Sequence, residues 1–133
     1  MRRVLLLEDS ASTRAFVRTA LASSTALGAL EVAEAASGFD ALRLLPRGAW
    51  DLVITDINMP DINGLELISF IRKSEAHRDT PILVISTASS ERDRERGLTL
   101  GASAYLIKPF TAQALVDQVL AQMGSAPTAG AHA

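Results

Sequence analysis

Charged and hydroxyl side chains follow several short apolar runs of this 133-residue sequence. Glu8 and Asp9 come directly after the first run, and Asp56 follows a β-branched stretch. Thr87 and Lys108 follow two later runs. One acid in such a position is usually a turn or cap residue. Carboxylates, a hydroxyl and an ammonium gathered in one place could instead bind a divalent cation and supply a nucleophilic carboxylate.

Five apolar runs alternate with segments whose apolar residues have helical spacing. The runs are Val4–Leu7, Leu30–Ala35, Leu52–Thr55, Ile82–Ile85 and Tyr105–Ile107. Helices are expected over 11–23, from 38 to about 45, around 67–71, over 90–100 and over 111–123. This alternation requires right-handed crossovers and a parallel sheet with helices on both faces. The sequence therefore predicts a doubly wound α/β domain over residues 1–123, with a disordered tail at 124–133.

The order of the strands decides which side chains meet. Ligand sites in open α/β sheets lie beyond the carboxyl ends of the strands, where the strand order reverses. In the common five-stranded order 2-1-3-4-5, the first and third strands are neighbours at that point. Glu8, Asp9 and Asp56 are then expected to share one crevice. Two carboxylates about 4 Å apart repel by roughly 1 kcal/mol in water-like surroundings, so the cluster needs raised pKa values or a cation.

The donor types predict which cation. Hard oxygen ligands without imidazole or thiolate suit Mg²⁺, and the chain contains no cysteine. We predict that Asp9 and Asp56 bind Mg²⁺, or Mn²⁺, together with the backbone carbonyl of Asn58. Glu8 is expected to contribute through a water molecule.

Two further strand ends complete a pocket for a phosphoryl group on Asp56. The cation and Lys108 would neutralise the phosphoryl oxygens, and Thr87 would donate a hydrogen bond. Ser86, directly before Thr87, could also supply a hydroxyl. The carboxylate would be the nucleophile, as in known aspartyl-phosphate chemistry.

Five segments resemble the receiver domain of bacterial two-component response regulators, most closely the small chemotaxis (CheY-like) type. They are "LLLEDS", "LVITDINMP", "GLELI", "VISTASS" and "GASAYLIKPF". The resemblance extends over nearly the whole chain to about Met123. It implies a flavodoxin-like fold with the strand order 2-1-3-4-5. The small chemotaxis regulator is itself a known case of this strand order. The order assumed above and the order implied by the resemblance are therefore not independent expectations.

Roles for individual residues follow from the resemblance. It implies that Asp56 is the phosphoacceptor, that Glu8 and Asp9 are the acidic pair beside Mg²⁺, and that Thr87 and Lys108 contact the phosphoryl group.

The resemblance also implies a switch. Tyr105 matches an aromatic residue that turns inward as Thr87 moves toward the phosphate, which would couple the site to the face formed by 90–100, 105–107 and 111–123. Asn58 and Ser89 occupy positions that tune the phosphoryl lifetime. The peptide bond before Pro109 is expected to be cis.

Together these observations predict a stand-alone receiver in a phosphorelay, not an enzyme beyond self-catalysed phosphotransfer and slow autodephosphorylation. A histidine kinase or phosphotransfer protein would donate the phosphoryl group, and a downstream protein would bind the switched face. An alternative is a receiver-like interaction module that works without phosphorylation. Another is a Mg²⁺-dependent phosphatase, but those enzymes typically carry the nucleophile after the first strand and a second acid two residues on. Here Asp56 follows the third run, with Asn58 at that offset.

Composition narrows the partners and the location. The formal net charge of −2 gives no general attraction to nucleic acid or anionic lipid. The N-terminal apolar run ends after four residues, and no stretch has the length of a membrane span. We therefore expect a cytoplasmic protein without nucleic-acid or membrane partners. The segment "ERDRER" at 91–96 pairs opposite charges three residues apart and is expected to be a solvated helix face.

Overall fold

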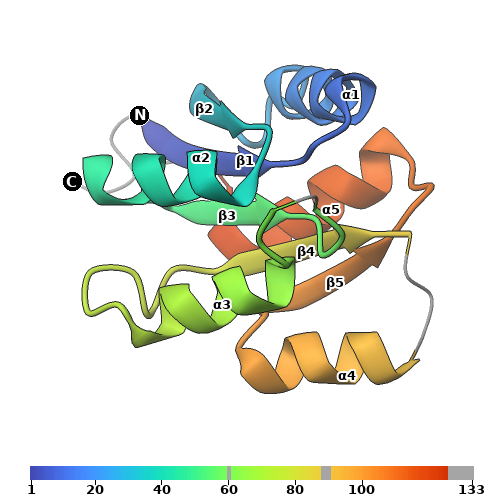
Figure 1. The fold of residues 1–133 in the computed structure, drawn as a ribbon. Helices are drawn as coiled ribbons and strands as arrows, with labels where there is room; N and C mark the ends of the chain where they lie inside the picture. The colour runs from blue at the N-terminus through green and yellow to red at the C-terminus, as the bar shows by residue number, and fades with distance from the viewer. Residues whose placement is uncertain (60, 88–90, 126–133) are drawn as a thin grey trace.

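The computed structural model describes residues 1–59, 61–87 and 91–125. Its strands form one parallel sheet in the order β2-β1-β3-β4-β5 (Figure 1). The strands are β1 Arg2–Leu7, β2 Leu30–Ala35, β3 Leu52–Thr55, β4 Ile82–Ser86 and β5 Ala104–Ile107. The predicted fold class and strand order are confirmed, and each predicted run lies within its strand.

Helices cover both faces of the sheet (Figure 1). They are α1 Ala11–Ala22, α2 Gly38–Leu44, α3 Gly64–Lys73, α4 Glu91–Leu100 and α5 Ala112–Met123, and a 3₁₀ turn, Leu45–Arg47, follows α2. The α1 and α5 helices pack on one face, and α2 and α3 pack on the other. The α4 helix lies beside α3.

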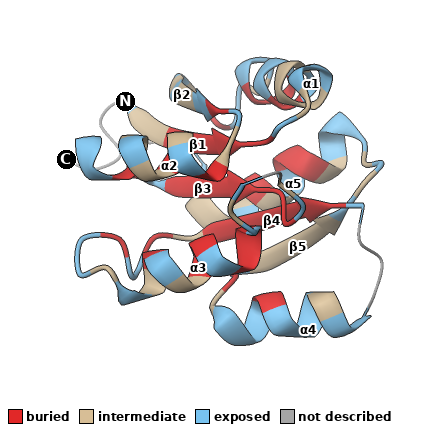
Figure 2. Cartoon of the chain, viewed as in Figure 1, coloured by how far each residue is buried: buried red, intermediate tan, exposed pale blue. Residues whose placement is uncertain are grey.

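Alternate residues of β1 supply the two halves of the core. Leu5 and Leu7 pack with α2 and α3, whereas Val4 and Leu6 pack with α1 and α5. The central strands are therefore buried on both faces (Figure 2). This burial explains why they read as continuous apolar runs and not as alternating ones.

Polar side chains begin most of the helices. The hydroxyl of Ser10 accepts a hydrogen bond from the Thr13 amide at α1, and the Thr111 hydroxyl accepts one from the Ala114 amide at α5. Asn63 caps α3 through the Leu65 amide. Such caps satisfy N–H groups that have no partner within the helix. Because Ser10 performs this function, Glu8 and Asp9 are left for the site.

Some boundaries and contacts differ from the expectations. The α2 helix ends at Leu44, one residue before its expected end, and Pro46 lies in the 3₁₀ turn that follows it. Of the three ion pairs expected in "ERDRER", the described residues show only Glu91 with Arg94, at 3.9 Å. The predicted tail lies outside the described residues from position 126 onward. Within the described ranges, no helix is long and apolar enough to cross a membrane.

Candidate functional site

The pairing of β1 with β3 brings the acidic residues together. Leu7 lies opposite Thr55 in the sheet, and the Asp56 amide donates to the Leu7 carbonyl at 3.1 Å. The residues that follow the two strands therefore leave the sheet side by side. Glu8, Asp9 and Asp56 each offer a carboxylate oxygen, and these oxygens all lie within 4.8 Å of one another. The predicted convergence of the three acids is confirmed.

Lys108 lies between two of these acids. Its Nζ donates to Asp56 Oδ2 at 2.7 Å and also to Glu8 Oε1. The Lys108 amide donates to the Ser86 carbonyl at 2.8 Å, which fixes the backbone of the β5 end against β4. Only 16% of the lysine side chain is exposed. The following bond, Lys108–Pro109, is cis, as the resemblance implied.

Burial and charge oppose each other around this lysine. Burial raises the pKa of Glu8, whose side chain is fully buried, and outweighs the lowering effect of the hydrogen bond from Lys108. Burial alone would lower the pKa of Lys108, but its hydrogen bonds to Asp56 and Glu8 raise it above its usual range. One ammonium is thus shared between two acids, and burial disfavours the charged form of Glu8.

The two oxygens of Asp56 have different partners. Oδ2 accepts from Lys108, and Oδ1 accepts from the Asn58 backbone amide at 2.9 Å. Asp56 is 5% exposed, whereas Asn58 and Asp9 are exposed. The phosphoacceptor candidate is therefore held by contacts from both sides at the edge of the sheet.

Gly64 brings the start of α3 against the end of β3. Its amide donates to the Ile57 carbonyl at 2.8 Å. A Cβ atom at this position would lie 2.2 Å from the Asp56 carbonyl oxygen and 2.7 Å from Ile57 Cα. Both neighbours are backbone atoms, so a side chain does not fit without moving the segment that carries Asp56.

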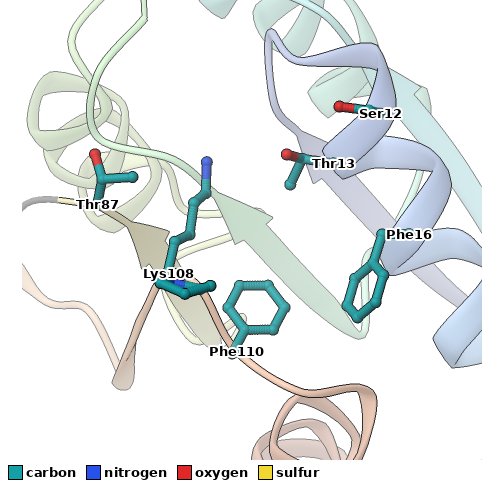
Figure 3. A pocket seen from close by; sticks show the side chains of 7 residues that line it. Ser12, Thr13, Phe16, Thr87, Lys108 and Phe110 are labelled. Atoms are coloured by element: carbon teal, nitrogen blue, oxygen red, sulfur yellow. The ribbon is translucent and has the colours of Figure 1, made fainter.

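Lys108, which contacts Asp56 and Glu8, also lines a cavity of about 480 Å³ (Figure 3). Thr87 and Lys108 contribute polar groups to it, and the rings of Phe16 and Phe110 meet edge to face with centroids 6.0 Å apart. Its remaining lining residues are Ser12, Thr13 and Pro109. The Thr87 side chain is exposed at this cavity, whereas Ser86 is fully buried in β4. This difference favours Thr87 as the hydroxyl that an incoming group can reach.

Two other predicted residues lie away from the acids or outside the described ranges. Tyr105 is partly buried and packs against the core between the sheet and α2–α3. Ser89 lies outside the described residues.

The structure adds residues that the sequence did not single out. Arg14 of α1 donates through Nη1 to the Glu8 carbonyl at 2.7 Å, and its Nε lies 3.5 Å from Glu34 Oε1 on β2. Arg14 thereby fixes the backbone just before Asp9. An arginine on a helix gives no sequence signal for this role, because the contact depends on where β1 ends. Asp61, in the loop after β3, also makes contacts across the fold.

The donor set fits a hard cation. Three carboxylate oxygens lie within one metal-sized cluster that contains no imidazole or thiolate. Carboxylate oxygens are the ligands that Mg²⁺ takes in proteins, usually one or two at a time with waters retained. The same residues carry too much negative charge for a single ammonium to balance.

The structure combines a doubly wound five-stranded sheet with a site at the carboxyl ends of its strands. The site consists of an acidic cluster, a lysine and a hydroxyl, and the fold and the site together define the class of domain to which the chain belongs. Residues 4–120 match the family model described as "Response regulator receiver domain". The chain belongs to the response regulator receiver domain family.

Individual relatives agree with this assignment. The chain is 33% identical to a chemotaxis protein CheY homolog of Campylobacter jejuni over 130 residues, which covers 97% of this chain and 98% of that protein. It is similar to the structure of the chemotaxis response regulator CheY4 of Vibrio cholerae, with 32% identity, a TM-score of 0.82, and coverage of 91% of this chain and 98% of that one.

A third relative carries a metal. The receiver domain of the sensor histidine kinase PA1611 of Pseudomonas aeruginosa is 28% identical, with a TM-score of 0.82 and coverage of 93% of this chain and 98% of that one. Its structure has a magnesium ion coordinated in the active-site cleft.

Proposed function

We propose that this domain accepts a phosphoryl group on Asp56 from the phosphohistidine of a kinase or phosphotransfer protein. An oxygen of the Asp56 carboxylate attacks phosphorus, the phosphorus–nitrogen bond breaks, and the imidazole leaves with a proton from solvent. The observation that carries the proposal is the position of Asp56. It is one of three clustered acids, and it is in direct contact with Lys108, which lines a cavity together with the exposed Thr87.

The other site residues have roles in this proposal that follow from their positions. Lys108, at 2.7 Å from Asp56 Oδ2, neutralises charge on the transferred group. Thr87, which follows the neighbouring strand β4, donates a hydrogen bond from its hydroxyl to the same phosphoryl group. Asp9, Asp56 and the Asn58 carbonyl hold Mg²⁺ or Mn²⁺, with Glu8 acting through water. When bound, the metal supplies positive charge and orients the phosphoryl oxygens.

A direct assay separates this function from the alternatives. Wild-type protein incubated with acetyl phosphate and Mg²⁺ should gain the mass of one phosphoryl group, and the gain should disappear in chelator and in Asp56→Asn. Asp117→Asn, on the outer side of α5, is the control and should be modified like the wild type. No modification of the wild type would instead favour a module that works unphosphorylated. Rapid continuous release of phosphate from added phosphate esters would favour a phosphatase.

We further propose that the phosphorylated domain acts through protein contact. Thr87 and Tyr105 form the switch, and the face of α4, β5 and α5 binds a downstream protein. Such a domain is a signalling module with slow autodephosphorylation, and the names of its chemotaxis relatives suggest a role in chemotaxis signalling. It would act in the cytoplasm, where Mg²⁺ and phosphohistidine donors are available.

Asn58 and Ser89 are proposed to set the phosphoryl lifetime by controlling the access of water. The small Ser89 side chain should leave the lifetime intermediate and not very long. Dephosphorylation rates of Asn58→Ala and Ser89→Glu test this role, and rates equal to that of the wild type in both variants would refute it.

A further inference from the structure

Asp61 connects the loop that follows β3 to the first turn of α2. Its Oδ1 accepts a hydrogen bond from the Gly38 amide at 2.9 Å, and its Oδ2 accepts one from the Phe39 amide at 3.0 Å. Oδ1 also accepts from the Ile62 amide at 2.7 Å within the loop itself. We call the two hydrogen bonds to Gly38 and Phe39 the α2 latch. The latch joins residues that are more than twenty positions apart in sequence.

The α2 latch depends on the negative charge of the Asp61 carboxylate. The first N–H groups of a helix have no partner within the helix, and a negative charge there is favourable. The hydroxyl of Ser37, the local cap, accepts the Asp40 amide, and Asp61 adds to the capping of α2 from outside by accepting the Gly38 and Phe39 amides. Hydrogen bonds from the amides of Phe39, Gly38 and Ile62 lower the pKa of Asp61 to about 2, although the residue is exposed. The carboxylate is therefore ionised at neutral pH, as the latch requires.

Gly38 allows the close approach. A Cβ atom at Gly38 would lie 2.5 Å from Ile62 Cβ and 3.3 Å from Asp61 Oδ1. The loop and the helix are thus in contact at this point, and a side chain on Gly38 would push them apart. Glycine is otherwise a poor helix residue, so its presence in the first turn is explained by this contact.

The α2 latch restrains the loop that contains Asn58. The Gly64 amide bonds the Ile57 carbonyl and joins the two ends of the loop, while Asp61 ties the far side of the loop to α2. Asn58 lies in the segment between these two restraints. Groups that orient metal ligands from behind typically change metal affinity 10- to 100-fold when they are removed.

We propose that Asp61 is a positioning residue for the cation site, because the α2 latch fixes the loop that presents the Asn58 carbonyl. This inference rests on the proposed function and deepens it, since it names a residue that regulates the same site without touching the metal. It also makes α2, on a different part of the surface from the α4–β5–α5 face, an element that can influence metal binding.

The first test is a pair of variants that open the latch in different ways. Asp61→Asn keeps the size of the side chain but places an NH₂ group where Oδ1 or Oδ2 accepts a hydrogen bond from a backbone amide. Gly38→Ala keeps Asp61 and separates the loop from the helix by steric contact. Each should weaken Mg²⁺ binding, measured by calorimetry on the protein without phosphoryl donor, by about tenfold.

A matched control removes one carboxylate from the first turn of α2, which the latch contacts. The Asp40 carboxylate pairs with Arg43 within α2 itself, so Asp40→Asn loses a carboxylate near α2 while the latch persists. Its Mg²⁺ affinity should stay within about twofold of the wild type, as for surface substitutions away from special contacts. This comparison separates positioning from a general loss of negative charge.

Two further measurements exclude a purely structural effect. In metal-free protein, hydrogen exchange at the Phe39 amide should be faster in Asp61→Asn and unchanged in Asp40→Asn. Gly38→Ala should favour the α2 helix itself, because alanine is the better helix former, and yet bind Mg²⁺ more weakly. The double variant should bind Mg²⁺ no more weakly than whichever single variant has the lower Mg²⁺ affinity, because both changes break the same α2 latch.

The outcomes are distinguishable. Mg²⁺ affinity equal to that of the wild type in both Asp61→Asn and Gly38→Ala, or an equal loss in Asp40→Asn, would overturn the latch and leave the proposed function intact. If Asp61→Asn does not fold, Gly38→Ala decides by the same criterion. A wild-type protein that fails to bind Mg²⁺ would contradict the proposed function itself, and the latch with it.

Discussion

Asp56 illustrates how a residue acquires a role from its neighbours. As a single acid after a strand, it is indistinguishable from a turn residue. In the fold, one of its oxygens contacts an ammonium and the other accepts a backbone amide. Glu8 and Asp9 lie in the same cluster, so the site concentrates negative charge that Lys108 balances only in part.

Asp9→Asn should stabilise the metal-free protein. Asp9 is close to two other carboxylates, and repulsion at such distances costs roughly 1 kcal/mol in water-like surroundings. Urea unfolding in chelator should therefore show a free energy of unfolding about 1 kcal/mol above that of the wild type. With excess Mg²⁺ the order should reverse, because the variant has lost a ligand. A metal-free variant that is less stable than the wild type would show that the acids are not under electrostatic strain.

The raised pKa of Glu8 predicts a pH dependence of stability. Below its ordinary value of 4.5 the carboxyl is protonated in both states, so its stabilising effect is fully present. As the pH rises through the higher folded pKa, the unfolded chain releases its proton first and the free energy of unfolding falls. The contribution of Lys108 persists across this range and is lost only above its ordinary value of 10.5.

Glu8→Gln isolates this titration. In metal-free protein, the stability of the wild type relative to Glu8→Gln should fall as the pH rises above 4.5, the ordinary pKa of the carboxyl group. Thermal or urea unfolding at several pH values measures the difference. A difference that grows with pH would mean that Lys108 outweighs burial at Glu8.

At the scale of elements, the start of α3 is the most constrained junction in the site. A Cβ at Gly64 would meet backbone atoms at 2.2 and 2.7 Å, whereas a Cβ at Gly97 of α4 would have an ordinary contact with Leu65 at 3.8 Å. Gly64→Ala should destabilise the protein by about 1–3 kcal/mol through overpacking. Gly97→Ala should stabilise it by up to about 1 kcal/mol through helix propensity. Equal effects in urea unfolding would contradict the steric account.

The elements themselves were largely predictable, because buried parallel strands leave continuous apolar runs and caps leave Ser, Thr or Asn before a helix. The convergence of Glu8, Asp9 and Asp56 was predictable once the strand order was assumed. The contacts of Arg14 and Asp61 were not, since each depends on a backbone group supplied by a distant segment. The Gly38 contact was hidden for the same reason.

At the scale of the whole molecule, the site and the proposed output face lie on neighbouring parts of the sheet. Thr87 follows β4, and Tyr105 of β5 packs against the core on the α2–α3 side. Phosphorylation can move the domain between conformations only by the difference in its stabilisation of the two. A shift from 1:99 to 99:1 would require roughly 5.5 kcal/mol.

This switch predicts a localised change in hydrogen exchange. With Mg²⁺ and beryllofluoride, which stands in for the phosphoryl group, amides of α4 and β5 should change their exchange rates. Amides of β2, at the opposite edge of the sheet, should not change. Asp56→Asn under the same conditions is the control, and its α4 and β5 amides should keep their exchange rates. A response spread evenly over the sheet would argue against a discrete output face.

The central claim is that Asp56 receives the phosphoryl group. Borohydride reduces an aspartyl phosphate to homoserine, which marks the modified position in a peptide map. After phosphorylation by acetyl phosphate or a phosphohistidine donor in the presence of Mg²⁺, we predict homoserine at position 56. Homoserine at Asp9 or at another acid, or no homoserine in a protein shown to bind Mg²⁺, would contradict the account.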